Sequence, residues 1–189
     1  SLAHVDGMRQ IRVGPESAGS EPGPACYGQG GMRPAVTDAD LVLGKLDPDN
    51  FAGGSIQLYA EQSRAALLAE LGDILDMDAL TAAFGLAEVG DETMANAARV
   101  HAVENGEDLS DYTMIAFGGA APLHAARLCE KLGVDRCLVP QGAGVGSAIG
   151  FLRAPFSFEA NRSVFMKLST FEPSLVAGLF AELEEEATK

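Results

Sequence analysis

Glycine residues follow a predicted strand at a spacing that suits the binding of a phosphorylated ligand. Periodicity and turn residues predict a strand at 112–117, then Gly118-Gly119, a helix at 121–132, a strand at 136–139 and a glycine-rich turn at 142–150. Glycine after a strand lets a ligand approach the backbone, and the next helix N-terminus offers free N–H groups and a positive dipole. This chemistry suits a nucleotide, although a tight turn alone explains the same glycines. Neither GxxxxGK[ST] nor GxGxxG in the right context occurs.

Three side chains are candidates for catalysis. His124 lies in the first turn of the predicted helix, where it either faces a ligand or makes a structural contact. Cys26 lies in a Gly/Pro-rich loop, but a nucleophile needs a base and an oxyanion hole, and the sequence shows neither. Asp38 begins another predicted helix together with Asp40. Helix capping explains both carboxylates, and the alternative for Asp38 is Mg²⁺ binding, since Mg²⁺ takes one or two carboxylates beside phosphates.

The segment 14–31 contains six Gly and three Pro, which excludes a helix or a regular strand. Long structureless loops inside compact domains are usually functional or disordered. We interpret this segment as an ordered functional loop rather than a flexible linker, because short structured segments flank it on both sides.

The surrounding elements indicate an α/β fold, because strands and helices alternate along the chain. Two short strands are predicted at 2–5 and 10–13, joined by a glycine-containing turn. Thr37 is a candidate cap for a short helix that ends near Gly44.

Longer helices are predicted on both sides of the glycine-rich unit. Helical spacing of apolar residues occurs at 59–71 and at 78–105, where Gly85 and Gly90 are expected to break the second helix. An acidic amphipathic helix is predicted at 172–187.

The composition of the chain argues against several classes of function. The chain has 189 residues and a net charge of −14, which disfavours binding to nucleic acid and to anionic membrane surfaces. Its longest uncharged stretch, 137–152, is too short and too rich in glycine to span a bilayer, and no signal peptide is visible. Three cysteines without a CxxC pair fit a reducing compartment, so we expect a cytoplasmic protein.

Two parts of the chain resemble signatures of the hydantoinase A/5-oxoprolinase family. The first is VGPESAGSEPGPACYGQGG at 13–31, followed by PAVTDADLVLGKL at 34–46. The second is IAFGGAAPLHAARLCEKLGV at 115–134, with VPQGAGVGSAIG at 139–150. The sequence departs from the common family pattern at four positions, where Thr, Asn, Gly and a larger apolar residue are usual: Ala35, Asp40, Ala121 and Gly146.

The resemblance implies a ribonuclease-H-like lobe of an actin-type ATPase fold, as in sugar kinases and heat-shock chaperones, in which two lobes close around ATP and Mg²⁺. It further implies that residues 1–155 are the back part of a hydantoinase A domain with a helical insertion at about 58–105. Residues 156–189 would begin a following region. The N-terminal lobe with its phosphate-binding motif should precede residue 1, so we expect this chain to be an incomplete lobe and inactive alone.

The resemblance also implies candidate reactions and partners. Family hydrolases open cyclic amides such as 5-oxoproline or hydantoins with ATP, and phosphorylation of the amide oxygen makes attack by water feasible. The alternatives are a subunit of an acetone/acetophenone-type carboxylase and a non-catalytic fragment that binds a partner through exposed apolar surface. Expected partners are a hydantoinase B-like subunit or domain, the missing lobe and a small cyclic amide, and a homo-oligomer stays open.

Site residues carry over by the same resemblance. Gly118, Gly119 and Ala120 resemble the adenosine-side element of the nucleotide site. The segment that faces the cleft would include Ser17, Gly19, Pro24, Cys26, Tyr27 and Thr37.

Overall fold

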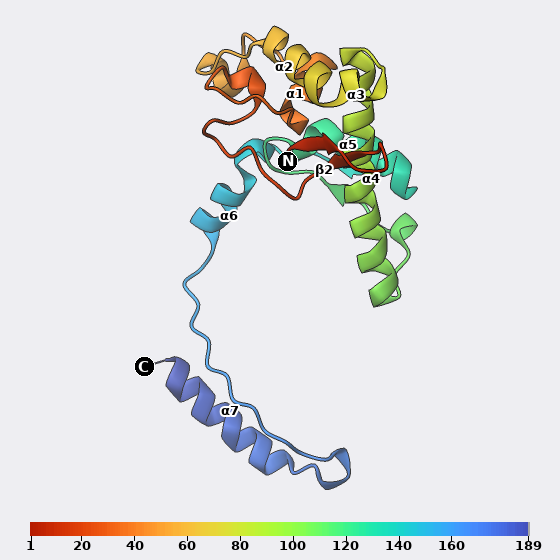
Figure 1. Cartoon of the computed structure of the whole chain (residues 1–189). Coiled ribbons are helices and arrows are strands. Elements are labelled where there is room, and N and C mark those ends of the chain that lie inside the picture. Colours follow the sequence, from red (N-terminus) through yellow and green to blue (C-terminus); the bar gives the residue numbers. More distant parts are fainter. Residues whose placement is uncertain (189) are drawn as a thin grey trace. The chain divides into compact units, whose positions relative to one another are not determined.

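The computed structural model describes residues 1–188. The chain divides into two compact units, 1–147 and 148–189. The first is mostly helical and holds two small sheets, each of two strands, so the expected α/β class is confirmed at this level (Figure 1). No helix of the described residues is long and apolar enough to cross a bilayer.

The N-terminal strands form the predicted hairpin. β1 (Ala3–Val5) pairs antiparallel with β2 (Ile11–Val13), with Ala3 opposite Val13. Asp6 fixes the turn between them, because its Oδ1 accepts hydrogen bonds from the backbone N–H groups of Met8 and Gln10. The hairpin lies against the long helix α4 (Ala79–Asn105) in Figure 1.

The prediction that α4 breaks near Gly85 and Gly90 is wrong, since the helix runs unbroken through both. A Cβ on Gly85 would lie 2.9 Å from Ile11 Cδ1, and one on Gly90 would lie 4.0 Å from Val13 Cγ1. At Gly85, therefore, the missing side chain lets β2 approach the helix closely. Packing against β2 outweighs the weak helix propensity of glycine.

The predicted helix after Thr37 is α1 (Val36–Val42), followed by Gly44 at φ +75°. Thr37 does not cap it, because the helix begins one residue earlier and Ala35 takes the N-cap position. The cap interaction comes instead from Asp38, whose Oδ2 accepts a hydrogen bond from Ala35 N at 2.8 Å. A carboxylate that reaches back from the third helical residue makes this half of a capping box.

α2 (Ala60–Leu67) packs on both α1 and α4. It continues through a π-helical turn, η3 (Leu68–Gly72), into α3 (Asp73–Leu75). Short 3₁₀ turns are η1 (Ala25–Tyr27), η2 (Phe51–Gly54) and η4 (Leu109–Asp111). Buried side chains from β1, α1, α2, η3 and α4 form the main core: Ala3, Ala39, Val42, Leu67, Leu71, Ala82, Ala83 and Leu86.

The glycine-rich unit forms a strand–helix–strand element with a parallel pair. β3 (Met114–Ile115) pairs with β4 (Cys137–Leu138), and both are shorter than predicted. Between them, α5 (Ala121–Leu132) has the predicted bounds and ends at Gly133, which adopts φ +68°. The glycine-rich turn forms η5 (Ala143–Val145) and leads into α6 (Gly146–Arg153).

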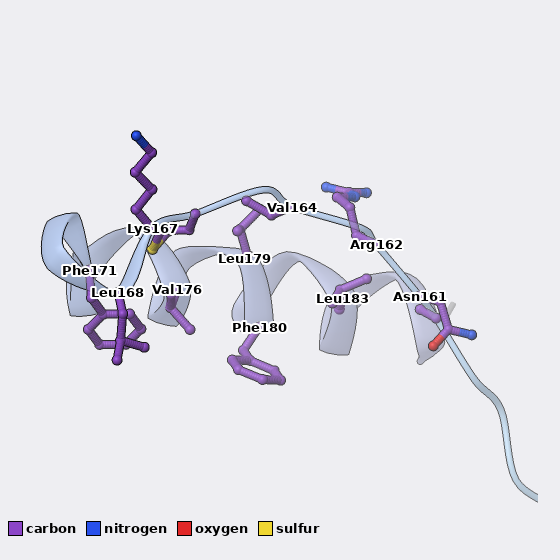
Figure 2. A pocket seen from close by; sticks show the side chains of 12 residues that line it. Asn161, Arg162, Val164, Lys167, Leu168, Phe171, Val176, Leu179, Phe180 and Leu183 are labelled. Carbon is purple, nitrogen blue, oxygen red and sulfur yellow. The ribbon is translucent and has the colours of Figure 1, made fainter.

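The second unit contains α7 (Pro173–Ala187), preceded by η6 (Leu168–Thr170) and an extended segment. Segment and helix enclose a groove of about 460 Å³ (Figure 2). Arg162 pairs with Glu182 at 2.7 Å and with Glu186 at 3.2 Å. Most of the groove lining is apolar: Val164, Met166, Leu168, Phe171, Val176, Leu179, Phe180 and Leu183.

Two glycines of the helical region should respond oppositely to alanine. Gly90→Ala should raise the free energy of unfolding by about 0.5–1 kcal/mol, because the site is helical and the new methyl group has room. Gly72→Ala should lower it by about 1–3 kcal/mol, because its Cβ would lie 2.7 Å from the carbonyl oxygen of Met77. Urea denaturation of the chain measures both. Shifts of the same sign would contradict this packing.

Candidate functional site

Asp38 is a buried anchor for the Gly/Pro-rich loop. Its side chain has no exposed surface. Oδ1 accepts hydrogen bonds from Cys26 N at 2.8 Å and from Ser63 Oγ at 2.7 Å. Oδ2 accepts from Ala25 N at 3.1 Å and from Ala35 N at 2.8 Å. Four donors occupy both oxygens, so the expected Mg²⁺-binding or catalytic role of Asp38 gains no support from the geometry.

Cys26 is a buried residue of the loop, within η1, and has no exposed surface. Burial, followed by the negative charge of Asp38, raises the pKa of the Cys26 thiol to about 12. The thiolate is the nucleophilic form of cysteine, so this thiol is poorly suited to attack at neutral pH. The geometry therefore does not support a catalytic role for Cys26.

The outer part of the loop surrounds a hollow of about 290 Å³. Ser17 lines it, and Glu16 pairs with Arg33 across the loop at 2.7 Å. Backbone segments approach closely here, since a Cβ on Gly31 would clash with the carbonyl oxygen of Gly23. The other predicted cleft residues differ in exposure: Gly19 is exposed, Pro24 is buried, and Tyr27 and Thr37 are half-buried.

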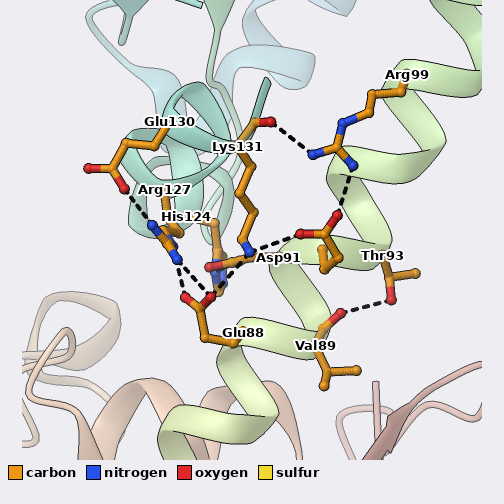
Figure 3. Close-up of polar contacts among 10 residues, drawn as sticks. Glu88, Val89, Asp91, Thr93, Arg99, His124, Arg127, Glu130 and Lys131 are labelled. Carbon is orange, nitrogen blue, oxygen red and sulfur yellow. Dashed lines mark hydrogen bonds and ion pairs between the residues drawn. The ribbon is translucent and has the colours of Figure 1, made fainter. Parts of the chain in front are cut away.

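His124 joins three helices through a buried polar triad, which we call the Asp40–His124–Asp91 triad. Its Nε2 lies 3.2 Å from Asp40 Oδ2 on α1, and its Nδ1 lies 2.8 Å from Asp91 Oδ1 on α4. Figure 3 shows Asp91 beside the imidazole. The exposed fractions are 4% for His124 and 2% for each carboxylate. This is the structural contact that the sequence left open for His124.

The triad favours the protonated imidazole. Both ring nitrogens face carboxylate oxygens, and both act as donors only in the imidazolium form. The hydrogen bond to Asp40 is the main cause that raises the pKa of His124, with Coulombic attraction to Asp40 and Asp91 in support. Burial and the charge of Lys45 act in the opposite direction.

Lys45, three residues after the end of α1, adds a second charge to the triad. Its Nζ lies 3.1 Å from Asp40 Oδ1. That oxygen is buried and, among the described residues, accepts no hydrogen bond of good geometry. Asp40 therefore faces two cations, His124 at Oδ2 and Lys45 at Oδ1.

The Gly118-Gly119 corner lies between β3 and α5 and is open. A Cβ on either glycine would meet no atom within 4 Å, and Gly118 adopts φ +105°. The N–H group of Gly118 donates to the carbonyl oxygen of Ala143 at 2.6 Å. Gly119 and Ala120 are exposed, and within residues 1–188 their N–H groups donate no hydrogen bond. The corner thus offers two free amides at a helix start, with no side chain that covers them.

Ion pairs on the surface hold the rest of α5 to α4 (Figure 3). Arg127 lies 2.8 Å from Glu88, and Lys131 lies 3.1 Å from Glu88 and 2.9 Å from Glu92. Exposed ion pairs each contribute about 0–1 kcal/mol. These pairs lie beyond the first turn of α5, so the buried triad is the polar contact that constrains where α5 begins.

The sequence did not identify Asp91 as part of this arrangement. One signal was available, because Asp91 lies four residues from both Ala87 and Ala95, and all three are buried on one face of α4. A carboxylate on the buried face of a helix requires a partner. No group of three His, Cys, Asp or Glu residues in the described part of the chain is arranged to hold a metal ion.

Comparison with known proteins shows which family the chain resembles. A model of the hydantoinase/oxoprolinase family matches residues 1–160, which hold both the Asp38 anchor and the triad. The chain belongs to the hydantoinase/oxoprolinase family. The resemblance seen in the two signature stretches is therefore confirmed.

Three relatives with named activities are similar to this hydantoinase/oxoprolinase chain. It is 36% identical to caprolactamase subunit alpha from Pseudomonas jessenii over 89% of this chain and 24% of the relative. It is 38% identical to the acetophenone carboxylase gamma subunit from Aromatoleum aromaticum over 90% of this chain and 24% of the relative. The nucleotide-free structure of acetone carboxylase, described as ATP-dependent, matches 99% of this chain and 28% of its own with a TM-score of 0.81 at 28% identity. The chain thus spans about a quarter of these relatives.

Stability should depend on pH through His124. Its folded-state pKa is raised above the ordinary value of 6.5, so the stabilisation is complete below that pH and declines as pH rises through the folded-state pKa. The difference in unfolding free energy between wild type and His124→Gln should therefore shrink above about pH 6.5. Denaturant titrations from pH 5.5 to 9 measure it. His101→Gln, an exposed site on α4, is the control, and a difference that stays constant with pH would refute the charged triad.

Proposed function

We propose that this chain is the nucleotide-side part of an ATP-dependent cyclic-amide hydrolase. The observation that carries the proposal is the open Gly118-Gly119 corner at the start of α5. Free amides at the N-terminus of a twelve-residue helix suit an anionic or nucleotide ligand. The ATP-dependent caprolactamase structure, which matches 100% of this chain with a TM-score of 0.75, supports both the nucleotide and the amide substrate.

The residues at the corner fit a nucleotide. Gly118, Gly119 and Ala120 bear no side chain larger than a methyl group, so a ligand can approach the backbone. The amide of Gly118 is already bound to Ala143, which leaves Gly119 and Ala120 as donors. When ATP is bound, its terminal phosphoryl group supplies the activation that turns an amide oxygen into a leaving group. The chain's own contribution is binding and orientation.

The described residues do not offer a set of ligands for Mg²⁺. Both oxygens of Asp38 are taken by four donors, and the triad carboxylates face His124 and Lys45. We therefore assign no step of the reaction to a metal bound by this chain.

The rest of the enzyme lies outside these residues. β3 and β4 expose apolar side chains, as Ile115 and Leu138 are 57% and 53% exposed. Further exposed apolar residues follow these strands, two of them just after the strand ends and one in η5: Phe117, Val139 and Val145. We propose that β3 and β4 belong to a larger ribonuclease-H-like sheet, completed by an N-terminal lobe, and that a hydantoinase B-type subunit completes the enzyme. Relatives named as subunits alpha and gamma support the second point.

A carboxylase subunit is the second candidate function. The 38% identity to the acetophenone carboxylase subunit and the TM-score of 0.81 with acetone carboxylase favour it. Either candidate places ATP at the same corner, so the reaction tests below separate them.

The complete protein with its partner subunit should consume ATP when a cyclic amide is supplied. ATP turnover with 5-oxoproline, a hydantoin or caprolactam should exceed the rate without substrate by about tenfold or more, as expected when substrate binding organises phosphoryl transfer. Phosphate release and chromatography of the ring-opened product measure it. Turnover that requires bicarbonate and a ketone would select the carboxylase. Absence of any ATP binding in calorimetry would reject both.

A further inference from the structure

The Gly118–Ala120 corner has no side chains that could fix its position. At one end, the N–H group of Gly118 donates a hydrogen bond to the carbonyl oxygen of Ala143 at 2.6 Å. The other end continues into the first turn of α5, where Leu123 N donates to the carbonyl oxygen of Ala120 at 3.0 Å. The contacts that hold this first turn therefore also set the position of the free amides.

The Asp40–His124–Asp91 triad is the buried contact that holds it. His124 is the fourth residue of α5, and its ring bonds to one carboxylate from α1 and one from α4. The ion pairs of Arg127 and Lys131 act further along the helix and are more exposed.

We propose that His124 is a positioning residue, and that the Asp40–His124–Asp91 triad fixes the first turn of α5 so that the amides of Gly119 and Ala120 are held in place for the nucleotide. The inference rests on the proposed function, because it names how that same site is set. His124 is buried among the helices, so it acts through the backbone rather than by contact with the ligand.

Because charged groups face the imidazole, the position of the first turn of α5 should depend on the protonation of His124. Asp40 faces it from α1 and Asp91 from α4, while Lys45 pairs with the far oxygen of Asp40. Loss of the imidazole proton would leave one buried carboxylate without its donor, which is costly in a dry site. Nucleotide affinity should therefore weaken as the pH rises through the titration of His124.

The experiment compares wild type and His124→Gln in the complete protein, with His101→Gln as the matched histidine control. Calorimetry measures the Kd for ATP from pH 6 to 9, and hydrogen–deuterium exchange follows residues 117–123, where the amides of Gly118 and Leu123 are hydrogen-bonded and report protection. His124→Gln should weaken ATP binding by about tenfold or more, since a displacement of 1 Å can cost a hundredfold. It should also speed exchange at 117–123 and lose the pH dependence. The control should stay within twofold of wild type.

Asp40→Asn provides a second variant that keeps a hydrogen-bond acceptor but removes one charge. It should weaken ATP binding at pH 6, but less than His124→Gln does, because the amide oxygen can still accept from the imidazole, and its affinity should depend less on pH. This variant also decides the matter if His124→Gln does not fold, because a merely structural His124 would leave the pH profile of Asp40→Asn like that of wild type.

The two proposals fail in different ways. Wild type that binds ATP, with His124→Gln of equal affinity and equal exchange at 117–123, would overturn the positioning role and leave the proposed function standing. Wild type that binds no ATP would overturn the proposed function. Exchange of the hydrogen-bonded amides of Gly118 and Leu123 then decides positioning alone: faster exchange in His124→Gln supports it, and unchanged exchange overturns it.

Discussion

Two buried carboxylates on α1 hold together the parts of this molecule that matter for its site. Asp38 and Asp40 lie two residues apart on one short helix, and neither is more than 2% exposed. A carboxylate in such a place is tolerated only when donors or cations compensate it. Asp38 obtains four hydrogen bonds from the loop, its own helix start and α2. Asp40 contacts the imidazole of His124 on α5. Each carboxylate therefore holds a different segment of the chain against α1.

This pairing explains why the two signature segments are found in one compact unit. The Gly/Pro-rich loop contributes only Cys26 and Tyr27 to a small apolar cluster with Leu41 and Leu58, and Asp38 orders it further through backbone amides. The glycine corner at 118–119 is equally bare, and its helix is fixed to α1 and α4 through His124. Backbone that must stay open to a ligand is thus fixed by buried polar contacts nearby. At the proposed nucleotide site, the glycine corner stays free of side chains, and the buried triad holds the helix that follows it.

The sequence predicted local structure well where one short segment decides it. α5 has the predicted bounds because Pro122 and Gly133 mark its ends, and the N-terminal hairpin follows from alternation and its turn. Prediction failed where distant residues decide: Gly85 and Gly90 remain helical because β2 packs on them, and Ala35 rather than Thr37 takes the cap position because Asp38 turns back to it. The partners of His124 are 84 residues before it and 33 before it in sequence, on helices whose packing no local pattern encodes.

Hydrogen exchange on Asp38→Asn tests most directly whether buried charge on α1 orders the loop. The amides of Ala25, Cys26 and Ala35 should lose protection relative to core amides of α4, because an amide group places a donor against donors where the carboxylate accepts four bonds. Asp135→Asn, on the exposed turn after α5, should leave them protected. Loop amides that keep wild-type protection in Asp38→Asn would contradict the account, because the loop would then be ordered without its anchor.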